Sequence, residues 1–149
     1  MIQPLEISNK SYAVQWLAET YERKAFGEKE PEFCTENGEY VRSKSEKIIA
    51  DKLKTMGIPY KYERPLVLRT IGKVHPDFTV LNVRTREEFV WEHFGMMDDP
   101  GYCERNLGKI VAYEKDGFFP GKNFIMTFET KEHPLNTKII DKLVENFLV

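Results

Sequence analysis

The first part of the chain has apolar residues at helical spacing, followed by a stretch without any regular period. Residues 10–23 (KSYAVQWLAETYER) are predicted to form a short amphipathic helix with Val14, Leu17 and Ala18 on one side. Residues 24–40 contain glycine, proline and many charged side chains, which is typical of an irregular connector. A helix and a connector are therefore expected before the main domain.

Three later segments combine a helical apolar period with end signals. Ser43-Lys44-Ser45-Glu46 precedes apolar residues at helical spacing and Gly57 follows them, so a helix is predicted between these points. In residues 98–116, two aspartates and an early proline provide the start of another helix. Residues 137–148 are predicted to form a closing amphipathic helix.

The segments between these helices have the composition and alternation of strands. Residues 60–68 are predicted as a strand that Pro65 makes irregular or confines to a sheet edge. Residues 75–82 and 88–94 are predicted to form a hairpin around a polar turn. Residues 123–128 (NFIMTF) are predicted as a buried strand.

The order of these elements predicts an α/β fold. Residues 1–40 supply an N-terminal helical extension, and residues 41–149 contain helix, three strands, helix, strand and helix. The long helix between the third and fourth strands predicts a crossover connection, and therefore parallel pairing somewhere in the sheet. The expected domain has an αβββαβ core with a mixed four-stranded sheet, flanked by helices.

Composition limits the kinds of protein that the chain can be. Its 149 residues are 41% hydrophobic and 31% charged, as in ordinary globular domains. The sequence has no apolar run of ~18 residues and no secretory signal pattern, so no membrane contact is expected. Cys34 and Cys103 form no CxxC pair, which favours reduced thiols in the cytoplasm. The net charge of −2 excludes a strongly basic coat but allows a local basic surface.

Two acids lie among apolar residues in the predicted hairpin. If the turn is centred near Arg84 and Thr85, Asp77 and Glu92 lie opposite each other and on the same face. Two facing carboxylates in an apolar setting need a cation, or one of them must be protonated. Mg²⁺ suits such a pair, because it takes oxygen ligands and often uses only one or two carboxylates.

Each acid also has a structural interpretation when it is considered alone. Asp77 can accept hydrogen bonds from a turn or a neighbouring arginine, and Glu92 can pair with a lysine at a sheet edge. The opposed register and the apolar neighbours of both acids together favour the metal site.

Pro76-Asp77, a short hairpin and then Glu92 resemble the motif of the PD-(D/E)XK nuclease superfamily, which has the restriction-endonuclease-like fold. The preceding helix with Glu46 and the αβββαβ order also match, over about residues 40–149. The resemblance implies that Asp77 and Glu92 bind Mg²⁺, or Mn²⁺ in its place. It also implies that Glu46 joins them directly or through water, and that the three acids serve hydrolysis of phosphodiester bonds.

One position departs from the family pattern. The family's lysine stands two residues after the glutamate, where this chain has Phe94, so the motif takes the form Glu92-His93-Phe94-Gly95. This form is similar to nuclease domains attached to some DNA helicases and to the branch related to very short patch repair endonucleases. The resemblance therefore implies DNA as the substrate and a helicase or another DNA-processing protein as a partner.

Two residues are candidates to replace the missing lysine. His93 is adjacent to Glu92, but a regular strand points its side chain to the opposite face. Its backbone carbonyl oxygen could still ligate the metal ion. Lys109 has Tyr113 one turn later on the same side of a helix, and the pair resembles the Gln-x-x-x-Tyr motif of RecB-like nucleases. Lys109 is therefore the preferred catalytic cation, with Tyr113 and His93 near the substrate. The alternative is that Lys109 is a solvated surface lysine.

The residues around Glu46 have two competing interpretations. Ser43-x-x-Glu46 is a capping box, in which the glutamate serves the helix start, whereas the family resemblance places Glu46 near the metal. Arg42 and Lys44 flank this position and are candidates to contact a phosphate backbone, or else belong to a solvated helix start.

These observations lead to one expected function and one alternative. The expected function is a Mg²⁺-dependent nuclease acting on DNA. Because the usual lysine is absent, the alternative is a nuclease-like module that binds nucleic acid or supports an assembly without cleaving.

Overall fold

A mixed four-stranded sheet forms the centre of the computed structural model, which describes residues 6–27 and 31–149. Its strands are β3 (Tyr60–Tyr62), β6 (Phe78–Leu81), β7 (Glu88–Phe94) and β8 (Phe124–Phe128). They lie in the order β3-β6-β7-β8, and β7 and β8 are parallel while the other neighbours are antiparallel. The predicted α/β class, with a mixed sheet and a parallel pair after a crossover helix, is confirmed.

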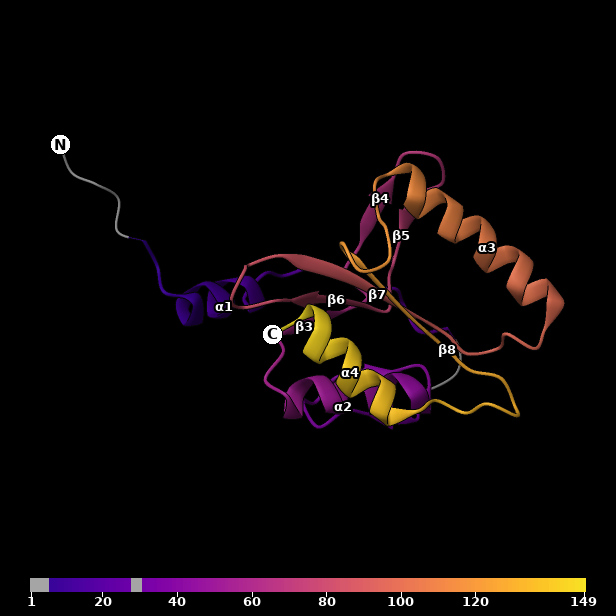
Figure 1. Cartoon of the computed structure of the whole chain (residues 1–149), viewed down its shortest axis with the longest axis horizontal. Coiled ribbons are helices and arrows are strands. Elements are labelled where there is room, and N and C mark those ends of the chain that lie inside the picture. The colour runs from indigo at the N-terminus through magenta and orange to yellow at the C-terminus, as the bar shows by residue number, and fades with distance from the viewer. Residues whose placement is uncertain (1–5, 28–30) are drawn as a thin grey trace.

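Helices cover both faces of this sheet (Figure 1). The helices α2 (Lys44–Thr55) and α4 (Thr137–Phe147) lie below it in the view of Figure 1, and α3 (Pro100–Lys115) lies above it. The larger core cluster forms on the lower side from inward-facing residues of the strands and of α2 and α4, such as Ile49, Trp91 and Ile140. A smaller cluster on the upper side contains Val90 and Tyr113.

The three main helices begin at capping side chains. Ser43 accepts a hydrogen bond from the backbone N–H of Glu46, and Asp99 and Asn136 cap α3 and α4 in the same way. Pro100 occupies the first turn of α3, where a missing N–H costs nothing. The helix starts expected from the sequence are therefore confirmed.

The segment predicted as one strand over residues 60–68 is two strands in different sheets. β3 ends at Tyr62, Glu63 has a φ of 54°, and β4 (Leu66–Leu68) pairs with β5 (Gly72–Val74) as a separate hairpin. A positive φ turns the chain away from the sheet, and Pro65 cannot donate a ladder hydrogen bond. The prediction of a sheet edge is confirmed for β3, while the prediction of a single strand is wrong.

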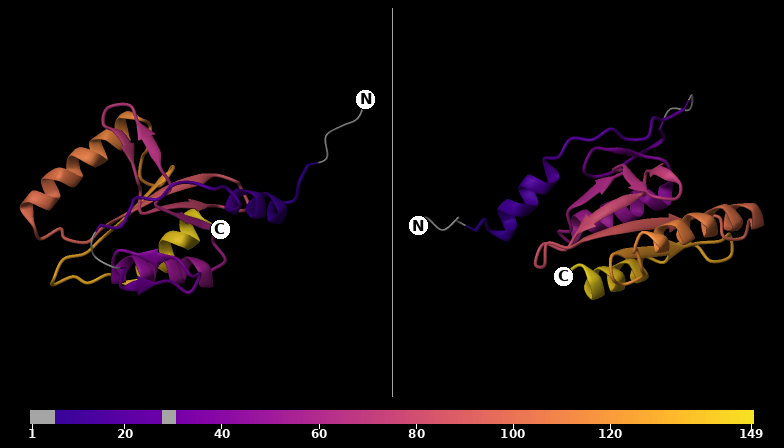
Figure 2. Two further views of the ribbon diagram at one scale, coloured as in Figure 1. Left: turned by 180° about the vertical axis from the view of Figure 1, so that it is seen from behind. Right: turned by 90° about the horizontal axis from the view of Figure 1, so that it is seen from above.

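The N-terminal helix is shorter than predicted. α1 covers Asn9–Leu17 instead of residues 10–23, and Val14 and Leu17 are 61% and 51% exposed. Trp16 is the buried residue of this helix, and its indole N–H donates to Glu88. The apolar side expected from Val14 and Leu17 is therefore wrong. Figure 2 shows α1 beside the sheet, away from α2 and α4.

The connector predicted over residues 24–40 also contains paired backbone. β1 (Phe33–Cys34) and β2 (Tyr40–Val41) form a small antiparallel sheet around a turn at Gly38, which has a φ of 98°. The turn signal was visible in the sequence, but the strands are too short to show a period. No helix within residues 6–27 and 31–149 is long and apolar enough to cross a membrane.

Candidate active site

Asp77 and Glu92 lie opposite each other across the β6–β7 hairpin. The register pairs Phe78 with Trp91, so the next residues outward along the two chains are Asp77 and Glu92. The opposition predicted from the turn position is confirmed. The backbone N–H of His93 donates to Asp77 Oδ2 at 2.7 Å, which ties the aspartate to the neighbouring strand.

The side chain of Glu92 is buried and receives hydrogen bonds from α3 on both oxygens. Lys109 Nζ donates to Oε2 at 2.9 Å, and the Tyr113 hydroxyl donates to Oε1 at 3.0 Å. Lys109 and Tyr113 are four residues apart, so they project from one side of the helix. The structure therefore brings Lys109 and Tyr113 onto the acid, and Lys109 is not a solvated surface lysine.

The environment of the two acids raises the pKa of both carboxyl groups. Burial and the charges of Glu92 and Glu46 raise the pKa of Asp77 well above its ordinary value, against the opposing hydrogen bond from His93. Burial also raises the pKa of Glu92, although Lys109 and Tyr113 oppose this effect. Among the ion pairs of the described residues, Lys109 bonds Glu92 and not Asp77, so this pair of carboxylates has a single cation.

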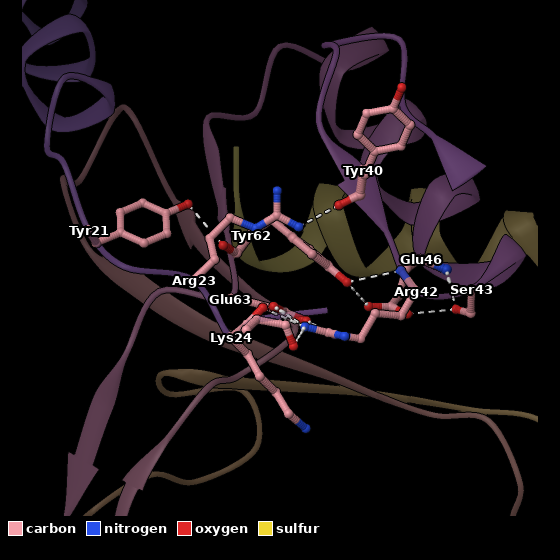
Figure 3. A network of polar contacts seen from close by, with 10 residues as sticks. Tyr21, Arg23, Lys24, Tyr40, Arg42, Ser43, Glu46, Tyr62 and Glu63 are labelled. Carbon is pink, nitrogen blue, oxygen red and sulfur yellow. Dashed lines mark hydrogen bonds and ion pairs between the residues drawn. The ribbon is translucent and has the colours of Figure 1, made fainter. Parts of the chain in front are cut away.

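Glu46 lies at the start of α2 and is held by two hydroxyl groups (Figure 3). The Tyr62 hydroxyl donates to Oε1 at 2.6 Å, and the Ser43 hydroxyl donates to Oε2 at 2.8 Å. The Tyr62 hydroxyl also accepts the backbone N–H of Arg42 at 3.1 Å. Glu46 is therefore bonded to the capping residue Ser43 at the start of α2, and its charge also contributes to the raised pKa of Asp77.

Arg42 and Lys44 differ in their surroundings. The guanidinium of Arg42 bonds Glu63 at 2.5 Å and the carbonyl oxygen of Lys24 at 2.6 Å, as Figure 3 shows. It also lies 4.4 Å above the ring of Phe26. Arg42 thus anchors the N-terminal segment to β3, whereas the side chain of Lys44 is exposed to solvent.

The ring of His93 lies on the face of β7 away from Glu92, as a regular strand requires. Its Nδ1 and Nε2 are each 2.7 Å from a partner, the Thr127 hydroxyl and the Glu129 carboxylate. Ser45 donates to the same carboxylate. Partial burial raises the pKa of Glu129, but the hydrogen bonds from Ser45 and His93 outweigh it and leave that pKa below its ordinary value. The ring therefore links β7, β8 and α2, while the backbone of His93 contacts Asp77.

Tyr102 is a further residue near the acids that the sequence analysis did not single out. Its hydroxyl accepts the backbone N–H of Gly95 at 3.0 Å, and the charges of Asp77 and Glu92 help burial to raise its pKa. Tyr102, Lys109 and Tyr113 follow the spacing i, i+7 and i+11, which is one helix face. This spacing was the signal available in the sequence.

The polar face of α3 is therefore turned toward the sheet at the acids. Leu107 of the same helix is 61% exposed and does not take part in this contact.

The donor set fits Mg²⁺ as a pair of carboxylates. Within the residues that the structure describes, no group of three or more His, Cys, Asp or Glu side chains is placed to hold a metal ion. Asp77 and Glu92 are nonetheless opposed, on one face and in excess of their cation, and Mg²⁺ requires only one or two protein carboxylates. The charge of Glu46 helps to raise the pKa of Asp77. Both carboxylate oxygens of Glu46 already accept hydrogen bonds from hydroxyl groups.

Comparisons with known proteins leave the family open. No protein-family model and no solved structure matches this chain. A segment of 114 residues is 37% identical to the uncharacterized protein MJ1519 of Methanocaldococcus jannaschii. This segment covers 76% of the chain but 9% of that protein, so the chain spans less than a tenth of its relative's length.

Proposed function

We propose that this chain is a Mg²⁺-dependent nuclease that hydrolyses phosphodiester bonds in DNA. The observation that carries the proposal is that Asp77 and Glu92 lie opposite each other and that Lys109 of α3 donates a hydrogen bond to Glu92. Glu92 is buried and Asp77 is half-buried, and carboxylates that repel each other in such a setting are costly unless they bind a cation. Acid pairs of this kind are concentrated at functional sites.

Asp77 and Glu92 would hold the metal ion, with Glu46 as the third acid, and Mn²⁺ could replace Mg²⁺. When bound, such an ion polarises a phosphoryl oxygen and lowers the pKa of water. Tyr113 orients the carboxylate of Glu92, and the backbone N–H of His93 orients that of Asp77. Lys109 supplies positive charge to the phosphate as its negative charge develops.

Other parts of the proposal concern the surroundings of the reaction. Lys44 is exposed beside Glu46 at the start of α2 and would contact a DNA phosphate there. Arg42 is paired with Glu63 and would add positive charge beside Lys44.

We assign the protein to the cytoplasm and expect a helicase or another DNA-processing protein as its partner.

Cleavage assays on the purified chain test the proposal. Labelled single-stranded, duplex and branched DNA would be incubated with Mg²⁺, with Mn²⁺ and with a chelator. We expect cleavage that needs the metal and that Asp77→Asn abolishes, while Asp98→Asn, an exposed aspartate outside the site, retains it. Metal-independent cleavage, or equal activity of Asp77→Asn, would contradict the proposal.

The hydrogen bonds that Glu92 already accepts favour a second function. Both of its carboxylate oxygens already accept hydrogen bonds from protein groups, Lys109 and Tyr113, and this arrangement would also suit a module that binds DNA without cleaving it. DNA binding without turnover under every metal condition would support this alternative.

A further inference from the structure

The β4–β5 hairpin stands on the same face of the sheet as the two acids. The side chains of Leu66, Leu68 and Val74 pack into the smaller core cluster, together with Val90 and Tyr113. Figure 1 shows the hairpin above the sheet beside the end of α3, and the reverse view in Figure 2 agrees. One side of the hairpin is therefore fixed to the acid-bearing face, and its other side is turned outward.

The outward side of the hairpin combines apolar and basic side chains. Val67 pairs across the ladder with Lys73, so these two side chains share the outer face. Val67 is 69% exposed, Ile71 in the turn is 51% exposed, and Lys73 is exposed. Val67, Ile71 and Lys73 together give the outer face of the hairpin an apolar and basic surface that a partner can contact.

Charge indicates which kind of partner this surface fits. Residues 64–76 contain Arg64, Arg69 and Lys73 and no acidic residue, in a chain whose net charge is −2. Arg64 pairs with Glu19, and Arg69 pairs with Asp116. Within residues 6–27 and 31–149, Lys73 has no such acidic partner. The free charge of the hairpin is therefore positive and lies on its outer face.

The hairpin is also held in place before any partner binds. The backbone N–H of Arg69 donates to Asp116 at 2.9 Å, and its guanidinium bonds Asp116 at 2.7 Å and the carbonyl oxygen of Lys115 at 2.6 Å. These contacts attach the hairpin turn to the last residues of α3, the helix that carries Lys109. A fixed ribbon loses little conformational entropy on binding.

We infer that the outer face of the β4–β5 hairpin binds duplex DNA beside the acid pair. Lys73 would contact a backbone phosphate, while Val67 and Ile71 would contact sugars and base edges. A two-stranded ribbon fits the major groove of B-DNA. Asp77 follows Val74 by three residues, which span at most about 11 Å, or about three nucleotide steps at 3.4 Å. The inference rests on the proposed function and adds duplex DNA as the bound form.

Fluorescence anisotropy with a labelled DNA duplex tests this inference. Binding would be measured with Mg²⁺ in an Asp77→Asn background, so that cleavage does not interfere. We expect Lys73→Gln to weaken binding about 8-fold at 0.1 M salt and to flatten the salt dependence by ~0.9 units of slope. Val67→Ser with Ile71→Ser should weaken binding and leave the slope unchanged. All three side chains are exposed, so the variants should fold, and circular dichroism would check this.

The matched control is Lys138→Gln, because Lys138 is an exposed lysine on α4, which covers the opposite face of the sheet. The inference is overturned if Lys73→Gln binds the duplex like this control, or if it loses affinity only for single-stranded DNA. Absence of duplex binding by the parent chain, as a protein-binding hairpin would produce, overturns it as well.

The two proposals fail in distinguishable ways. Metal-dependent cleavage that the hairpin variants do not alter would leave the proposed nuclease standing and overturn the hairpin surface. Hairpin-dependent duplex binding by a chain that cleaves no DNA under any metal condition would support the surface and contradict the nuclease.

Discussion

Lys109 Nζ lies 2.9 Å from Glu92 Oε2, although the two residues are on a helix and a strand that are separated by a loop. The strand position two residues after Glu92 holds Phe94, whose ring stacks on Phe128 at a centroid distance of 5.4 Å. An apolar contact thus occupies this strand position, and a cation reaches Glu92 from α3 instead.

Removing this cation should lower both stability and activity. For Lys109→Ala we expect a loss of about 1.5–3 kcal/mol in the free energy of unfolding, because Glu92 loses a charged hydrogen-bond donor. We expect the cleavage rate to fall roughly 100-fold with little change in DNA affinity, as for a contact made in the transition state. Denaturant unfolding and single-turnover cleavage would measure these effects.

Lys115→Ala is the control for Lys109→Ala, because Lys115 is an exposed lysine on the same helix. A double-mutant cycle with Glu92→Gln isolates the pair. Should Lys109→Ala reduce DNA affinity and flatten its salt dependence without altering the rate, Lys109 would be a phosphate-binding residue instead.

The Tyr113 hydroxyl should keep Glu92 ionised at lower pH. It donates to the charged form of the carboxylate, so its loss in Tyr113→Phe should raise the pKa of Glu92 further. The acid limb of the cleavage profile should then move to higher pH. Carbon NMR titration of Glu92 would measure the same shift without activity. Tyr40→Phe, at an exposed tyrosine, should move neither, and an unmoved Glu92 titration in Tyr113→Phe would refute the expectation.

Asp77→Asn should stabilise the protein in the absence of metal. The raised pKa of Asp77 means that the folded state binds more protons than the unfolded state between the ordinary value of 3.8 and the raised one. Stability therefore falls as pH rises through this window. Asparagine keeps an oxygen for the His93 N–H and removes a repulsion of roughly 1 kcal/mol, which corresponds to roughly 2–4 °C in Tm.

Thermal melts in a chelator from pH 4 to pH 8 would measure this effect. The advantage of Asp77→Asn over the unmodified chain should grow with pH. A large loss of stability at pH 8 would show that Asp77 is mainly a structural hydrogen-bond acceptor.

Glu129 should have the opposite pH dependence. Its pKa lies below the ordinary value of 4.5, so it contributes stability above that value, and this contribution is lost as pH falls through the lowered pKa. Glu129→Gln should therefore lower Tm at pH 7, and the difference should narrow below about pH 4.5. Glu132→Gln, at an exposed glutamate, serves as the control. A constant difference across the range would argue against the His93–Glu129 link.

Local signals in the sequence were sufficient for much of the fold and for the acid pair. The Ser43 cap and Gly57 marked α2, because capping depends on residues within one turn. The short polar turn between β6 and β7 set the register, because in a hairpin the pairing partners follow from the position of the turn. Asp77 and Glu92 could therefore be placed opposite each other without any tertiary information.

Packing decided what these local signals do not contain. Pro65 predicted an irregularity, but only the assembled sheet shows that the chain leaves β3 and builds a separate hairpin on the acid-bearing face. The contacts of Glu92 with Lys109 and of Glu46 with Tyr62 join residues 17 and 16 positions apart in different elements. Such contacts depend on how α3 and α2 lie on the sheet. The buried carboxylate of Glu92 needs polar partners, and the inward side of α3 supplies them as Lys109 and Tyr113.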